Sequence, residues 1–264
     1  MIRSYRAELT KLLRRRVVLI ALAVAAVFAI GSTIIVMSAV KPAAETLPAL
    51  RATATIEALS GAGGGSEVFR LAIAFAGTFI FVVFVGVMAA EFSRGTIRTM
   101  LLHQPRRIRL LAGKLAAMLT FAAGALAVTE AITWVTARAL ASGAGVGTAS
   151  WISVTGLSSA ISDYGVVLVW ILGYALLATA LAVVVRSVPI ALAIGIAWSG
   201  PIEHLIQNAW SGAGRWFPGL LLEAFAGGGT SEVSAPRAIA TVALYAIVAG
   251  IVACVVFARR DVTS

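Results

Sequence analysis

Long apolar stretches separated by shorter polar ones set the hydropathy pattern of this chain. Five of the apolar stretches run for about 20 residues, the length that crosses the hydrocarbon core of a bilayer as a helix. They occupy residues 17–40, 71–90, 115–137, 164–185 and 238–258. We interpret each as a membrane-spanning helix. The first is too long for the apolar core of a cleaved signal peptide, so we expect it to be retained.

A sixth span is predicted at residues 187–208. Its first half is apolar, but the helix must then continue through the polar sequence SGPIEH at 199–204. Polar groups are tolerated at membrane depth where they face protein or a cavity rather than lipid. We therefore count this segment as a span, and the charge distribution described below agrees with an even number.

The N-terminal segment before the first span carries a shorter helical signal. Residues 3–16 place Tyr5, Leu9 and Leu12 at helical spacing among several cations. This pattern predicts an amphipathic helix that lies on an anionic inner leaflet and also fixes the topology.

Outer segments are expected at residues 41–70, 138–163 and 209–237. Residues 41–70 contain Pro42, Pro48 and the glycine run GAGGGS at 61–66, and they are predicted to form a flexible loop around a short helical piece. The sequence GLLLEAF at 219–225 is too short to cross a bilayer, and tryptophans, which favour the headgroup level, lie on its N-terminal side. An interfacial or re-entrant helix is the expectation there.

Composition excludes a water-soluble globule. Of the 264 residues, 60% are hydrophobic and only 12% charged, with a mean hydropathy of +0.99, whereas soluble domains have about 25% charged residues. The net charge of +10 would suggest nucleic acid in a soluble protein. In a membrane protein, Lys and Arg instead gather on cytoplasmic segments, so no nucleic-acid partner is expected.

The cations also orient the chain. With six spans, 15 of the 21 Lys and Arg residues fall on one side, together with both termini. That side is cytoplasmic by the positive-inside rule. The sequence thus predicts an all-α polytopic protein of six transmembrane helices in the cytoplasmic membrane of a prokaryote.

The segment 91–114, between the second and third spans, holds six cations and one carboxylate, Glu91. Residues 92–102 have helical periodicity, with Phe92, Ile97, Met100 and Leu101 on one side. Gly95 is expected inside this helix, where glycine costs about 1 kcal/mol relative to Ala, so a bend or a close approach would explain it.

Two arginines and one proline complete the pattern. Arg94 and Arg98 are four residues apart and repel each other unless an anionic surface faces them. Pro105 ends the segment and suits the first turn of the next helix. A short amphipathic helix parallel to the membrane is predicted, contacting lipid phosphates or an acidic partner.

The spacing Glu91-x-x-x-Gly95-Thr96, then Leu101, Pro105, Arg107 and Gly113-Lys114 resembles the signature of ABC-2 type exporter permeases. Other parts of the chain agree with this resemblance. They are Ala7-Glu8-x-x-Lys11 near the start, Arg186-Ser187 after the fourth span and Arg259-Arg260-Asp261 after the sixth.

The resemblance implies a partner. Segment 91–114 would carry the coupling helix, which docks on a cytoplasmic ABC ATPase subunit. Two permease protomers, identical or different, and two ATPases would form the exporter. The substrate would be amphiphilic, such as a drug, a peptide antibiotic or a lipid-like molecule. The implied coupling residues are Glu91, Phe92, Arg94, Gly95, Thr96, Arg98, Leu101, Pro105 and Arg107.

The chain is not expected to hydrolyse ATP or to bind a cofactor of its own. A phosphate-binding loop needs G-x-x-x-x-G-K-[ST], but Ile108 and Leu115 occupy the first and last of these positions around Gly113-Lys114. ATP and Mg²⁺ would therefore be bound by the partner subunit. No metal site is expected, because the chain has only two histidines and one cysteine.

Polar side chains inside the predicted spans are candidates for a second site. Glu130, Trp134, Glu203 and His204 could line a substrate pathway or an outer vestibule, because ionisable groups at membrane depth are costly without a role. Glu130 and Glu203 could equally be structural, paired with Arg138 or Arg215.

Two other classes of function stay open. An ATP-independent secondary transporter or channel would use Glu130 and Glu203 as ion-coupling sites, although the inverted repeat found in many such proteins is not visible here. A membrane scaffold or sensor would bind a partner through 91–114 and move no cargo.

Overall fold

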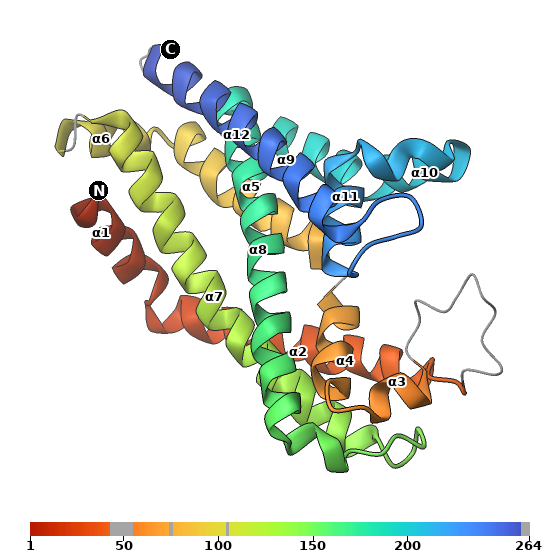
Figure 1. Ribbon diagram of the computed structural model, residues 1–264. Coiled ribbons are helices and arrows are strands. Elements are labelled where there is room, and N and C mark those ends of the chain that lie inside the picture. Colours follow the sequence, from red (N-terminus) through yellow and green to blue (C-terminus); the bar gives the residue numbers. More distant parts are fainter. Residues whose placement is uncertain (43–54, 74–75, 104–105, 260–264) are drawn as a thin grey trace. The chain divides into compact units, whose positions relative to one another are not determined.

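The computed structural model describes residues 1–42, 55–73, 76–103 and 106–259, and most of this backbone is helical (Figure 1). Within these ranges the only β pairing consists of two isolated bridges, Lys41 with Thr55 and Gly229 with Ser234. The predicted all-α class is confirmed.

Four of the described helices are long and apolar enough to cross a membrane. They are α2 (Arg15–Ser38), α7 (Arg107–Leu140), α8 (Val154–Val185) and α12 (Ala235–Arg259). Large apolar side chains on α2 and α12 point outward, and Val27 is 75% exposed. Such surfaces are compatible with a membrane protein, because lipid tails are as apolar as these side chains.

The chain forms two compact units. The first contains Met1–Arg14, Ala76–Phe121 and the residues from Val169 on, and the second contains the described parts of 15–75 together with Ala122–Leu168. The long helices α7 and α8 each contribute residues to both units.

The first unit packs short helices against long ones. α9 (Val188–Ala197) runs along α5 (Gly77–Ser93), and α11 (Pro218–Ala226) packs on α12. Close approach between elements depends on glycine. A Cβ at Gly195 of α9 would lie 3.1 Å from the ring of Phe81 on α5.

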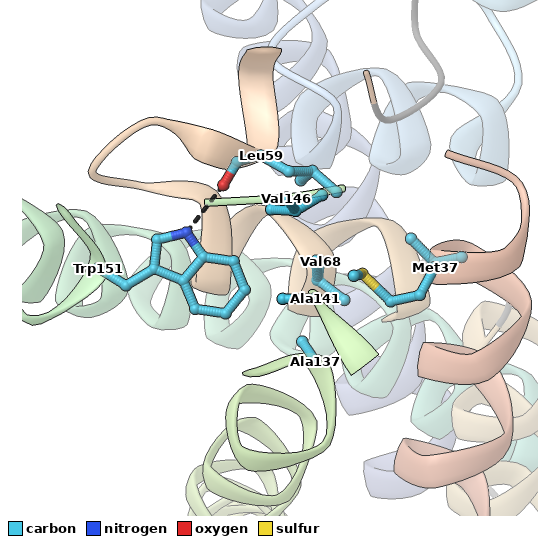
Figure 2. Close-up of a cluster of buried hydrophobic side chains, with 8 residues drawn as sticks. Met37, Leu59, Val68, Ala137, Ala141, Val146 and Trp151 are labelled. Carbon is cyan, nitrogen blue, oxygen red and sulfur yellow. Dashed lines mark hydrogen bonds between the residues drawn. The ribbon is translucent and has the colours of Figure 1, made fainter. Parts of the chain in front are cut away.

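The core of the second unit joins α2, α4 (Gly64–Ile73), the end of α7 and the turn η4 (Ala149–Ile152), and it includes Met37, Val68, Ala137 and Trp151 (Figure 2). The Nε1 atom of Trp151 donates a 2.8 Å hydrogen bond to the carbonyl oxygen of Leu59, in the short helix α3 (Ile56–Ser60). The tryptophan thus anchors the segment before α4.

Of the loop predicted at 41–70, residues 43–54 lie outside the described residues, and the remainder is more helical than expected, with α3 and α4 joined by a turn at 61–63. Helix α4 begins at Gly64, and Gly64 and Gly65 lie against two indole rings. A Cβ at Gly64 would lie 2.7 Å from Nε1 of Trp151, and one at Gly65 would collide with Trp134. These glycines therefore permit tight packing.

Two predicted spans are interrupted. The segment 187–208 consists of the ten-residue α9, the π-helical turn η5 (Trp198–Ile202) and α10 (Glu203–Ala209). Pro201 lies in the turn, where its missing N–H breaks the regular hydrogen-bond pattern. The segment 71–90 is split as well, because α4 ends at Ile73 and α5 begins at Gly77. Together these two helices would count as a fifth span by length and composition.

Helix boundaries differ from the prediction on the inner segments as well. The amphipathic helix predicted at 3–16 ends early, since α1 covers Ile2–Leu12 and α2 begins at Arg15. α7 begins at Arg107, so the second half of 91–114 belongs to this long helix. A short helix, α11, covers the predicted 219–225, and its interfacial or re-entrant position on the outer side stays a prediction.

Candidate functional site

Four charged side chains from three helices form a closed ring of ion pairs in the first unit. Nζ of Lys11 in α1 lies 2.8 Å from Oε1 of Glu91 in α5 and 3.3 Å from Oε1 of Glu8. Nζ of Lys114 in α7 lies 2.9 Å from the same Glu8 oxygen and also contacts Oε1 of Glu91. Each lysine therefore bridges both carboxylates.

The ring is neutral and largely withdrawn from solvent. Glu8, Glu91 and Lys114 are buried, with 6%, 5% and 4% of their surfaces exposed, whereas the Lys11 side chain is half exposed. Charges can be buried when each has a partner of opposite sign. Burial alone would lower the pKa of Lys11, but the hydrogen bond and charge of Glu91, with those of Glu8, outweigh it and raise the pKa above its usual value. Lys11 therefore stays protonated at physiological pH.

A glycine lets α1 approach the start of α7. A Cβ at Gly113 would collide with Oγ of Ser4 and would lie 2.8 Å from the carbonyl oxygen of Met1. The hydroxyl of Tyr5 donates to Oγ1 of Thr120 at 3.2 Å, about two helical turns further along α7. Gly113 and Lys114 thus have a packing role and an electrostatic role where α1 meets α7.

A sharp joint separates α5 from the short helix α6 (Thr96–His103). Arg94 caps α5, and Gly95 follows it with a φ of +68°, the left-handed conformation that commonly ends helices. Oγ1 of Thr96 donates to the carbonyl oxygen of Glu91 at 3.1 Å. Gly95 is therefore not inside a helix as predicted. Of the two expected explanations, the bend applies, because no atom lies within 4 Å of the Cβ position.

The helix α6 presents one apolar residue prominently to solvent. Leu102 is 84% exposed, whereas Ile97 on the same helix is buried. Leu101, predicted to be a coupling residue, is half-buried. The exposed side of α6 is a surface that a partner could cover.

Arg107 ties the beginning of α7 to the end of α12. Its Nη1 donates to the carbonyl oxygens of Phe257, at 3.0 Å, and Ala258, at 3.4 Å. These carbonyl groups lie in the last turn of α12 that the structure describes, where the carbonyl groups of a helix end need partners from outside the helix. A predicted coupling residue thus serves as a C-terminal cap for a different helix.

Phe92 and Arg186 complete this region. The ring of Phe92 contacts Phe257 edge-on, with centroids 5.8 Å apart, and the Arg186 guanidinium lies 5.5 Å from the Phe92 centroid. Arg186 adopts a positive φ of 56° between α8 and α9, and its carbonyl oxygen accepts a 3.2 Å hydrogen bond from Oγ of Ser93.

The residues of the sequence signature therefore meet in space. Around the base of α6, Glu91 and Lys114 join α5 and α7 to α1, and Thr96 bonds back to Glu91. Phe92 contacts α12 and the junction of α8 with α9, and Arg107 joins α7 to α12. Arg94 is exposed at the joint. Pro105 lies outside the described residues, and Arg98 is described only as part of the backbone of α6.

The polar residues predicted for an outer vestibule fall into separate groups. Glu203 in α10 is 1% exposed, and its Oε2 accepts a 2.9 Å hydrogen bond from the backbone N–H of Leu220, in the first turn of α11. A carboxylate is favourable there because the first N–H groups of a helix lack partners and carry partial positive charge. Glu203 holds α10 and α11 together.

Other charged groups have local partners of their own. Nε2 of His204 lies 3.2 Å from Oε2 of Glu223 in α11. Arg215, considered above as a partner of Glu203, instead donates to the carbonyl oxygen of Glu232 at 3.1 Å.

Glu130 and Trp134 lie one turn apart on the part of α7 that belongs to the second unit. Arg138 lies over the ring of Trp134, 5.6 Å from its centroid. In the same unit Arg70 pairs with Asp163 at 3.2 Å, and the Asp163 charge acts on Glu130. Among the described residues Oε1 of Glu130 is buried without a hydrogen-bond partner.

Three members of the ring were absent from the set of site residues expected from the sequence: Glu8, Lys11 and Lys114. A signal for them exists. Glu8 is the only acidic residue among the cations of the first 16 positions, and Glu91 is the only one in 91–114. A single carboxylate within a strongly cationic segment is a candidate for a specific ion pair.

The fold and this region define an all-helical protein with four membrane-length apolar helices and a buried ring of ion pairs at the base of a short helix. The chain belongs to the family described as "Protein of unknown function (DUF2705)", which it matches over residues 22–263. No curated protein and no solved structure matches the chain.

Proposed function

We propose that this chain is the membrane-spanning permease subunit of an ABC exporter and that α6 couples it to a separate cytoplasmic ATPase. One observation carries the proposal. The base of α6 is fixed by a buried ring of ion pairs, while the helix itself presents the exposed Leu102. A docking helix needs this combination of a firm attachment and an accessible surface.

The contacts around α6 suggest how force would be transmitted. A displacement of α6 acts on α5 through the Gly95 joint, and from there on α1 and α7 through Glu91. Arg107 extends the connection to α12. Because packed interiors deform little, such a displacement moves whole helices rather than single side chains.

In this proposal six spans cross the cytoplasmic membrane of a prokaryote, with both termini inside, and α9–η5–α10 is a broken span. Two permease protomers and two ATPases form the exporter, and the ATPases bind ATP and Mg²⁺. An amphiphilic cargo suits the chain, because the described membrane-length helices expose many apolar and few charged side chains.

A second candidate is an ion-coupled transporter that needs no ATPase. The observation in its favour is Glu130. Its Oε1 is buried without a hydrogen-bond partner among the described residues, and the negative charge of Asp163 repels its carboxylate. Intramembrane carboxylates commonly serve as coupling sites.

A substitution in α6 tests the first candidate. The full chain is coexpressed with an ABC ATPase, sought first among the products of the neighbouring genes, and ATP hydrolysis is measured after reconstitution into lipid vesicles. Leu102→Asp should weaken docking by roughly 10- to 100-fold, because a buried Leu side chain contributes about 1.5–3 kcal/mol. The unfolding temperature should stay unchanged, since Leu102 is exposed.

The matched control is Leu157→Asp, at a position in α8 that is 64% exposed and lies in a predicted outer segment. It should leave ATP hydrolysis at the wild-type level. Unaltered hydrolysis with Leu102→Asp would contradict the docking proposal. Flux driven by an ion gradient in vesicles that contain this chain alone, abolished by Glu130→Gln, would favour the second candidate.

A further inference from the structure

A cleft of about 920 Å³ lies beside the ring of ion pairs, between α1, α6 and the start of α7. Arg3, Arg106 and Arg109 line it, and all three are exposed. Glu8 and Lys114, which also line the cleft, already neutralise each other within the ring. The cleft therefore offers three cations that the buried ring does not neutralise.

Apolar side chains form most of the remaining lining, together with Ser4 and Thr99. Ile2 is 70% exposed, and Met100 and Leu110 contribute from α6 and α7. Three guanidinium groups next to apolar surface fit a molecule with an anionic head and an apolar body.

We infer that this cleft binds the phosphate headgroup of an anionic phospholipid from the inner leaflet. Guanidinium groups pair with phosphate through two parallel N–H donors, which makes arginine well suited to this ligand. The glycerol backbone and the first part of an acyl chain contact Ile2 and Met100. The inference is independent of the proposed export function.

A phospholipid fits the cleft better than two other anions. Free phosphate would satisfy the arginines but would leave Ile2 and Met100 facing water. An acidic protein segment would satisfy the charges, but α1 has the composition of a helix that lies on an anionic membrane surface. A lipid accounts for both the charges and the apolar walls.

The bound lipid would hold α1 against α7. Arg3 lies on α1, Arg106 directly precedes α7, and Arg109 lies in the first turn of α7. One phosphate that contacts all three therefore connects the two helices. The ring of ion pairs, Gly113 and the lipid would then act on the same contact. Anionic lipid should therefore stabilise the region around α6.

The test uses the full chain in detergent and three probes: dioctanoyl phosphatidylglycerol, dioctanoyl phosphatidylcholine and inorganic phosphate. Binding is followed by native mass spectrometry and by the shift in unfolding temperature. The wild type should bind phosphatidylglycerol at least tenfold more tightly than either other probe.

Two triple variants decide whether the cleft is the site. Arg3→Gln, Arg106→Gln and Arg109→Gln combined should weaken phosphatidylglycerol binding at least tenfold. Arg14→Gln, Arg15→Gln and Arg16→Gln combined remove the same charge from exposed positions outside the cleft and should preserve it. Both variants should fold, because all six side chains are exposed, and circular dichroism checks this.

Three results would overturn the inference. They are equal binding of free phosphate, equal weakening in both triple variants, and unchanged phosphatidylglycerol binding in the cleft variant. Unchanged lipid binding together with lost association of the coexpressed ATPase would assign the cleft to an acidic protein segment. Failure of the export proposal would leave these lipid measurements unaffected, so the two outcomes are distinguishable.

Discussion

At the residue scale, the two lysines in the ring of ion pairs differ in how deeply they are buried. Lys114 is buried and contacts both carboxylates, whereas Lys11 makes similar contacts from a half-exposed position. Buried ion pairs often add little net stability, but removal of one partner leaves an uncompensated charge. The exposed lysine should therefore be the more dispensable of the two.

Lys114→Met should lower the free energy of unfolding by about 3–5 kcal/mol, because the buried Glu8 and Glu91 then share only Lys11. Lys11→Met should cost less, since Lys114 still pairs with both carboxylates and water reaches the position. Unfolding of the full chain in detergent micelles, followed by circular dichroism, measures both values.

Glu91→Gln added to Lys114→Met provides the internal control, because it removes one uncompensated charge and should recover part of the loss. Equal losses in the free energy of unfolding for Lys11→Met and Lys114→Met would contradict the prediction that the buried lysine contributes more than the exposed one.

The ring also shows the limit of local sequence patterns. Glu91 and Lys114 belong to a recognisable spacing, and Glu8 and Lys11 to another, yet no local pattern pairs them. Lys11 and Glu91 are 80 residues apart in the sequence. A helical periodicity reports which residues share a face, but not which distant helix that face meets.

At the scale of the elements, the joint between α5 and α6 depends on one backbone conformation. Gly95 has a φ of +68°, which residues with a Cβ adopt at a cost, although no atom would obstruct that Cβ. The orientation of α6 relative to α5 is therefore set by conformation and by the Thr96 hydrogen bond to Glu91.

Gly95→Ala should destabilise the chain by about 1–2 kcal/mol, and Gly95→Asn by less, because Asn tolerates the left-handed conformation. Gly124→Ala is the matched control. Gly124 lies inside α7, and it too has no atom within 4 Å of its Cβ position. It should stabilise the chain by up to about 1 kcal/mol, since Ala favours helix over Gly.

Thermal unfolding of the three variants in one detergent makes this comparison. A stabilising Gly95→Ala would contradict the strained joint, and a destabilising Gly124→Ala would show that the comparison is not controlled.

Long uniform elements were the easiest to predict. The apolar runs at 17–40 and 238–258 correspond closely to α2 and α12, because an uninterrupted apolar helix satisfies its own backbone. The break within 187–208 is harder to predict, because a hydropathy pattern contains no information on the backbone hydrogen bonds that Pro201 changes. The packing of Gly64 and Gly65 depends on Trp134 and Trp151, which are distant in sequence.

At the scale of the whole molecule, α7 and α8 each run through both compact units. The first unit contains the ring of ion pairs and the cationic cleft, and the second contains Glu130 and the Arg70–Asp163 pair. The sequence predicts that segment 91–114 is cytoplasmic and that segment 138–163 is on the outer side of the membrane.

Cysteine labelling in intact cells tests that topology. After Cys254→Ser, a cysteine at Leu157 should react with a membrane-impermeant maleimide, and one at Leu102 should react only after the membrane is opened. Both positions are well exposed, at 64% and 84%, so reactivity reports access and not burial. Reaction at Leu102 in intact cells would reverse the predicted orientation.

The ring of ion pairs also sets an order of events during synthesis. Glu8 and Lys11 can pair with each other within α1, but Glu91 is made 80 residues after Lys11, and Lys114 follows later still. At about 5–20 residues per second, that delay lasts several seconds. During this time α1 can remain at the membrane surface, where its charges stay hydrated. Helix α1 is therefore held in its final place only after α7 has begun.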